Sequence, residues 1–128
     1  MTNNGDVTMR TDRSDLLRSP PSALIWWCLP IALALAAQPL GLPYHTAAAV
    51  WSLSFAWMAV GCLLNARRCH RVHCFISGPV FFAGAIAAGL LAGGAFASNR
   101  QVLNDIIAAT TVLVASSFLP EIFWRKYL

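Results

Sequence analysis

The sequence predicts an all-α integral membrane protein, a four-helix bundle with its N- and C-termini in the cytoplasm. Two observations predict this fold. Apolar residues make up 58% of the 128 positions and charged residues only 11%, whereas about 25% of an ordinary globular domain is charged. The apolar residues are also gathered into four long runs, separated by short links that hold turn-forming or basic residues. A water-soluble domain of this size needs far more polar surface.

Residues 1–21 are predicted to be a polar cytoplasmic tail that ends at the membrane surface, and residues 22–128 a transmembrane domain. The predicted spans are residues 23–40, 45–64, 75–97 and 102–124. Each is close to the roughly 20 residues that a helix needs to cross a bilayer. Pro30 should kink the first span because it lacks a backbone donor. The fourth span has the shortest uncharged centre, between Asp105 and Glu121.

Basic residues predict the orientation of these spans. They cluster in the N-terminal tail, in the link between the second and third spans, and at the C-terminus, while the other two links share only Arg100. Because cytoplasmic loops are enriched in Lys and Arg, four spans place all three basic regions in the cytoplasm. We therefore expect a multi-pass protein of the inner membrane. A cleavable signal peptide is an alternative for the first span, but the long leader and the Trp26–Trp27 pair oppose it.

The stretch from residue 62 to 74 holds three of the four cysteines and two of the three histidines. Thiolate and imidazole groups bind ions of the Hg, Cu and Zn class. If the second span continues as a helix through this stretch, these groups share one face and the arginines occupy the other. If the stretch is a loop, that geometry fails. The predicted metal ligands are Cys69, His70, His73 and Cys74 at the cytoplasmic end, with Cys62 and Cys28 as relay ligands inside the membrane.

A path from Met58 or Cys28 through Cys62 would lead such an ion toward the cytosol. The competing interpretation is structural: cysteine packs well as a small apolar residue, and basic residues at a membrane edge bind lipid phosphates. A membrane thiol enzyme is a weaker hypothesis, because no Cys-x-x-Cys occurs and the cytosol is reducing.

Two other features allow alternatives. Gly89 and Gly93 form a small-xxx-small pair, which permits either packing inside the bundle or a homodimer face. Asp105 and Glu121 are acids near span ends, where intramembrane acids are often functional. We favour an ion pair between Glu121 and Arg125, four residues apart on one helix, over a proton relay.

The run Asn65-Ala66-Arg67-Arg68-Cys69-x-Arg71-x-His73-Cys74, followed by Gly78-Pro79, resembles a motif of small uncharacterised bacterial multi-span membrane proteins. That resemblance implies several spans and no particular activity. In layout alone the chain is similar to bacterial mercuric-ion transporters, which pass Hg(II) from cysteines in a helix to cysteines on the cytoplasmic side. It departs from them by lacking an adjacent cysteine pair in its first span.

These observations favour a protein that binds or transports a thiophilic metal ion through its cytoplasmic Cys/His cluster. No acid–base–nucleophile constellation and no nucleic-acid-binding motif occurs in the sequence, so we expect neither an enzyme nor a nucleic-acid partner. The expected partners are the lipid bilayer and either further copies of the chain or a larger membrane complex. No cofactor is implied apart from a thiophilic ion. The alternative function is a non-catalytic accessory or scaffold subunit of such a complex.

Overall fold

The computed structural model describes residues 19–70, 72–95 and 99–123, and every regular element in these ranges is a helix. The all-α prediction is therefore confirmed for the described residues. The predicted cytoplasmic tail lies almost wholly outside them, as does Arg125, the predicted partner of Glu121. The elements in chain order are α2 (Pro20–Ala23), the π-helix η1 (Leu24–Cys28), α3 (Leu29–Ala36), α4 (Tyr44–Cys69), α5 (Val72–Ala92), α6 (Arg100–Ser116) and α7 (Leu119–Phe123).

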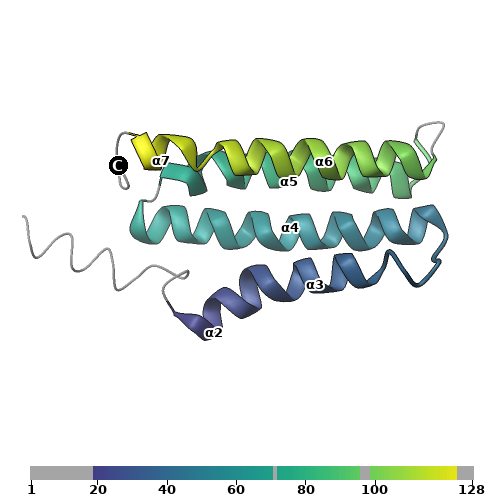
Figure 1. The fold of residues 1–128 in the computed structure, drawn as a ribbon, viewed down its shortest axis with the longest axis horizontal. Helices are drawn as coiled ribbons and strands as arrows, with labels where there is room; N and C mark the ends of the chain where they lie inside the picture. Colours follow the sequence, from purple (N-terminus) through teal and green to yellow (C-terminus); the bar gives the residue numbers. More distant parts are fainter. Residues whose placement is uncertain (1–18, 71, 96–98, 124–128) are drawn as a thin grey trace, which may run out of the picture.

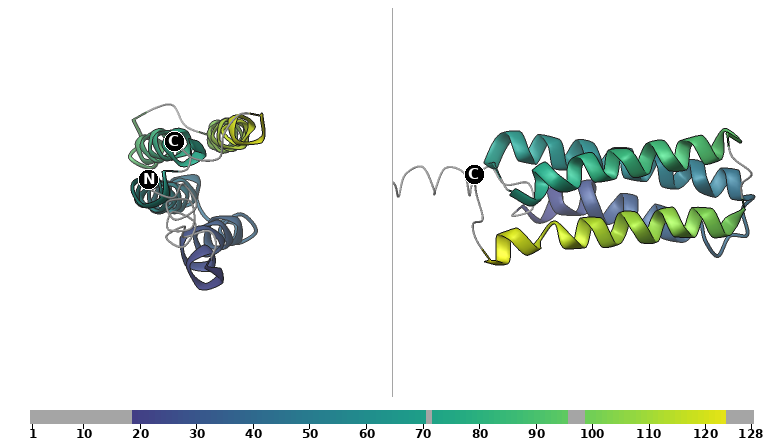
Figure 2. Two further views of the ribbon diagram at one scale, coloured as in Figure 1. Left: turned by 90° about the vertical axis from the view of Figure 1, so that its left-hand side faces the viewer. Right: turned by 90° about the horizontal axis from the view of Figure 1, so that it is seen from above.

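The long helices lie side by side and alternate in direction (Figure 1). α4 and α5 occupy the centre, α3 packs on the free side of α4, and α6 packs mainly on α5 (Figure 2). One end of the array holds the start of α2, the α4–α5 turn and α7. The other end holds the links from α3 to α4 and from α5 to α6. Residues 19, 70 and 123 therefore lie toward the same end.

Two of these helices are long and apolar enough to cross a membrane, judged by length and composition over the described residues. They are α4, over Tyr44–Arg68, and α5, over Val72–Ala92, and they correspond to the predicted second and third spans. The apolar segment Pro20–Ala36 is shorter than these two. α6 has 17 residues and includes Arg100 and Asp105.

Prolines lie at two distortions of the helices, one inside Pro20–Ala36 and one between α6 and α7. Pro30 lacks the N–H that would bond to the carbonyl of residue 26, and the helix before it widens into the π-turn η1, where the Leu29 N–H bonds to the Leu24 carbonyl. The segment bends between α2 and α3 (Figure 1). Pro120 stands in the first turn of α7, directly after the break that ends α6. In that break, Ser117 Oγ donates to the Val114 carbonyl at 2.6 Å, a bond that tends to bend helices.

The turn between α4 and α5 is very short. α4 ends at Cys69, and His70 follows as its C-cap in the left-handed conformation, with φ 52° and ψ 36°. Arg67 and Arg68 occupy the last turn of α4, where positive charge is favourable because the helix dipole is negative there. α5 then begins at Val72 and runs back along α4. The stretch 65–74 is thus two helices joined by a tight turn, and not one continuous helix.

Small residues allow α5 to approach its two neighbours closely. Ser52 Oγ of α4 donates to the Ala85 carbonyl of α5 at 2.7 Å, and a Cβ added at Gly89 would lie 3.1 Å from that same Oγ. On the side toward α6, a Cβ at Gly84 would lie 2.7 Å from Thr110 Oγ1. Gly84 and Gly89 therefore allow close packing inside this chain, whereas a Cβ at Gly93, the other member of the predicted small-xxx-small pair, would meet only backbone atoms of its own helix.

Replacing Gly84 by Leu is expected to destabilise the fold, because the added side chain overlaps Thr110 and Phe55. Overpacking of this kind costs about 1–3 kcal/mol. Gly93→Leu is the control, since a Cβ there meets only backbone atoms of its own helix at 3.6 Å or more. Thermal unfolding in detergent, followed by tryptophan fluorescence, should give a lower midpoint for Gly84→Leu than for Gly93→Leu. Equal midpoints would contradict this packing.

Candidate functional site

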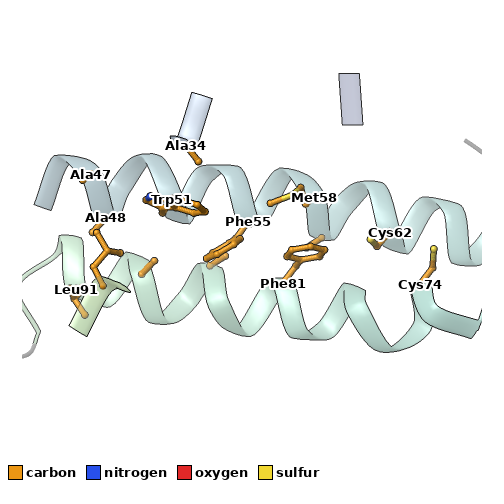
Figure 3. Packing of buried hydrophobic residues seen from close by; sticks show 14 of the residues in the cluster. Ala34, Ala47, Ala48, Trp51, Phe55, Met58, Cys62, Cys74, Phe81 and Leu91 are labelled. Atoms are coloured by element: carbon orange, nitrogen blue, oxygen red, sulfur yellow. The ribbon is translucent and has the colours of Figure 1, made fainter. Parts of the chain in front are cut away.

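The α4–α5 turn brings two of the four cysteines together. Cys62 lies in α4, two turns before its end, and Cys74 lies in the first turn of α5. Both side chains are buried, with 2% and 0% of their surfaces exposed. They extend toward each other from the facing helices (Figure 3), and the Cys74 side chain is a hydrogen-bond partner of Cys62.

Hydrogen-bond donors surround both sulfur atoms. Ser77 Oγ donates to Cys62 Sγ at 3.5 Å, and the Trp27 side chain also bonds to Cys62. Asn65 Nδ2 donates to Cys74 Sγ at 3.5 Å. A neutral thiol is only a weak acceptor, whereas an anionic sulfur accepts such bonds strongly. The surroundings are therefore complementary to negative charge on the two sulfurs, which is the form in which cysteine binds metal ions.

Asn65 and His73 are polar groups held in the interior of the helix pair. Asn65 is fully buried and His73 is 2% exposed. Burying such groups is costly unless they form hydrogen bonds. His73 Nε2 lies 3.2 Å from Cys74 Sγ, and its ring stacks on Phe118, with centroids 4.4 Å apart and planes 20° apart. The link between α6 and α7 thus covers the histidine beside the thiol pair.

The predicted relay ligand Cys28 does not reach this pair. It ends the π-turn η1 and is exposed, whereas its neighbour Trp27 packs beside Cys62. A π-turn contains an extra residue relative to an α-helical turn, so it changes which side chains face α4. Trp26 also packs on α4, where the centroid of its ring lies 6.2 Å from the ring centroid of Trp57.

His70 also stands apart from the buried pair. The single helical face predicted for Cys69, His70, His73 and Cys74 does not form, because the helix ends at Cys69 and reverses direction at His70. His70 is exposed, and its ring stacks on that of Phe75 with centroids 6.3 Å apart. The side chain of Cys69 lies outside the described part of the structure.

Among the side chains that the structure describes, no group of three or more His, Cys, Asp or Glu residues is placed to hold a metal ion. What the fold assembles is a buried pair of thiols with hydrogen-bond donors on both sulfurs. Chemically, such a pair can bind an ion that accepts few ligands, or pass it on by ligand exchange.

Sequence reasoning named Cys62, Cys74 and His73, and it missed Asn65, Ser77 and Trp27. The sequence did hold a signal for Asn65 and Ser77, because a polar side chain in an apolar span usually bonds to a neighbouring helix. No such signal exists for Trp27, whose position depends on the π-turn. Comparison with known protein families, with curated proteins and with solved structures found no match.

Replacing Asn65 by Ala is expected to destabilise the protein by about 1–3 kcal/mol, because it removes the donor to Cys74 and leaves space in the interior. Asn104→Ala makes the same chemical change on the exposed side of α6 and should alter stability by no more than about 0.5 kcal/mol. Thermal unfolding of the two variants in the same detergent measures the difference. A larger effect at Asn104 than at Asn65 would mean that Asn65 does not support the thiol pair.

Proposed function

We propose that this chain is a small multi-pass inner-membrane protein that binds a thiophilic metal ion between Cys62 and Cys74 and serves in its transport. One observation carries the proposal. Two buried thiols from facing helices lie together, and donors from Ser77 and Asn65 point at their sulfur atoms. Packing alone gives no reason to direct polar donors at both members of a cysteine pair.

The outer surfaces of α4 and α5 support a membrane location. Large apolar side chains on these surfaces are exposed, and in water a patch of this extent would promote association. In a membrane, lipid chains would cover this patch, and it would not drive association. The exposed residues include Leu53, Trp57, Val60, Phe82, Ile86 and Leu90.

Four spans and cytoplasmic termini complete the proposed topology. Pro20–Ala36 and α6 run beside the two apolar helices, and each is shorter than they are (Figures 1 and 2). Arg67 and Arg68 are exposed at the end that holds the thiol pair, and positive charge there supports a cytoplasmic location for that end. At the opposite end, Arg100 Nη2 donates to the Leu42 carbonyl at 2.6 Å and joins the two links there.

The coordination chemistry narrows the class of ion. Structural zinc sites almost always use four ligands, and catalytic zinc sites use three protein ligands with water. The described side chains give no such set of His, Cys, Asp and Glu. Cu(I) and Hg(II) bind stably to two thiolates and fit the pair better. Cys69 lies two helical turns beyond Cys62 toward the cytoplasmic end, and we assign it and His70 as acceptor ligands for ion release.

Replacing Cys62 and Cys74 together by Ser is expected to abolish ion binding, because no thiolate pair remains inside the helix array. The measurement is metal content by mass spectrometry of detergent-purified protein after exposure to Hg(II), Cu(I) or Zn(II) and washing. The matched control is Cys28→Ser, which removes an exposed thiol and should retain the ion. Equal retention in the double variant and the control would refute the site.

The second candidate function is a non-catalytic accessory subunit of a larger membrane complex. α6 favours it, because Asp105 is exposed and accepts a hydrogen bond from Gln101 Nε2 at 3.0 Å. A charged group on a lipid-facing surface is costly, and a partner helix would cover it. This function requires a defined protein that co-purifies in mild detergent and is released by a bulky substitution at Asp105. It also requires that this co-purification does not change when Cys62 and Cys74 are replaced.

A further inference from the structure

We infer that Cys62 and Cys74 form a redox-active dithiol, and that hydrogen peroxide converts this pair to a disulfide between α4 and α5. The inference uses the two sulfur atoms of the proposed ion site, but it does not require that an ion binds there.

Three residues of α5 surround the side chain of Cys62. Cys74 is its hydrogen-bond partner, and Ser77 Oγ donates to its sulfur at 3.5 Å. A Cβ added at Gly78, one turn beyond Cys74, would lie 3.7 Å from the Cβ of Cys62. Since Cβ atoms joined by a disulfide are about 3.5–4.5 Å apart, the backbone of α5 approaches Cys62 as closely as a bridge requires. The two cysteine side chains extend toward each other in this interface (Figure 3).

Hydrogen-bond donors around the pair favour the reactive form of each thiol. The thiolate, and not the neutral thiol, attacks an oxidant. Asn65 Nδ2 donates to Cys74 Sγ at 3.5 Å, while Ser77 and Trp27 bond to Cys62. Hydrogen bonds to an anionic sulfur are stronger than bonds to a neutral one, so these donors stabilise either thiolate as it forms.

The oxidation has two steps. In the first, one sulfur attacks a peroxide oxygen, the O–O bond breaks, a sulfenic acid forms, and the other oxygen leaves as water with the thiol proton. In the second, the other sulfur attacks the sulfenic sulfur. The S–S bond forms as the S–O bond breaks, and the hydroxide leaves as water with the second thiol proton. The two sulfurs together lose two electrons, and one molecule of peroxide accepts them and becomes two molecules of water.

Burial determines which oxidants can reach the pair. Cys62 is 2% exposed and Cys74 is 0% exposed, so a large charged disulfide such as oxidised glutathione cannot contact either sulfur. Hydrogen peroxide is uncharged and close to water in size, and the pair lies near one end of α4 and in the first turn of α5. Because the partner sulfur is adjacent, the sulfenic acid condenses within the chain and not with another thiol.

The test uses the full detergent-purified chain in a Cys28→Ser/Cys69→Ser background, so that only the pair can react. After treatment with hydrogen peroxide, the remaining thiols are labelled with a maleimide in SDS and counted by intact mass. Both thiols should be lost, the unlabelled mass should fall by two hydrogen atoms, and the chain should stay monomeric on a non-reducing gel. A thiol reductant should restore both thiols, and oxidised glutathione in place of peroxide should leave both unreacted.

The matched control moves one thiol of the pair to the outer surface of α4. Cys62→Ser/Val60→Cys, in the same background, retains two cysteines at a similar spacing. Val60 is 49% exposed, and two residues along a helix place it on nearly the opposite face from Cys62. Although its new thiol is more accessible to peroxide, the folded control should form no reducible disulfide within one chain.

Retention of both thiols after peroxide, loss that a reductant does not reverse, or a disulfide that joins two chains would overturn the inference. So would an equal yield of the internal disulfide in the control, because the helix contact would then not determine the pairing. Reaction with oxidised glutathione would overturn the assignment of small peroxides as the oxidant. The proposed function fails by a different result, a wild type that holds no more ion than Cys62→Ser/Cys74→Ser, and disulfide formation does not depend on that result.

Discussion

The close antiparallel contact of α4 with α5 determines the rest of the structure. It depends on a turn at His70 that reverses the chain immediately after Cys69, and on small residues that let the two backbones approach. Ser52 reaches the Ala85 carbonyl across this contact, and the aromatic rings of Trp51, Phe55 and Phe81 fill its middle (Figure 3). Because the turn is short, residues a few positions before and after it must face each other. Cys62 and Cys74 do so as a consequence.

The same contact explains the polar side chains in an apolar protein. Asn65 and His73 flank the turn at similar depth, and each directs a nitrogen at Cys74 Sγ. A polar group buried between helices is tolerated when it has a partner there, and the thiol pair provides one. Phe118, in the link between α6 and α7, covers the histidine ring. Two helices and the link between α6 and α7 therefore contribute to one small cluster at the basic end of the array. The outer surface of the long helices remains apolar.

Much of this fold can be predicted from the sequence, and the reasons for the failures are physical. Uninterrupted apolar runs locate α4 and α5 because length and hydropathy are properties of the chain alone. The helix end at Cys69 cannot be read in this way, because His70 takes a left-handed conformation that more often needs glycine or asparagine. The condition under which Cys69, His70, His73 and Cys74 would share one face, a helix that continues past Cys69, is therefore not met. Cys28 lies away from Cys62 because of the π-turn before Pro30, and a proline signals a distortion without specifying its form. The pairing of Cys62 with Cys74 follows from the tertiary contact and not from their spacing.

If the Cys62–Cys74 pair is sufficient to hold an ion, a chain that retains only these two cysteines should still bind one. The measurement is the number of sulfur neighbours around Hg(II) by X-ray absorption, made on the detergent-purified Cys28→Ser/Cys69→Ser variant after washing. Hg(II) should be retained and should have two sulfur neighbours from within one chain, at every protein concentration. Loss of Hg(II) from this variant, or retention that depends on protein concentration because the ion bridges two chains, would show that the pair is not an ion site by itself.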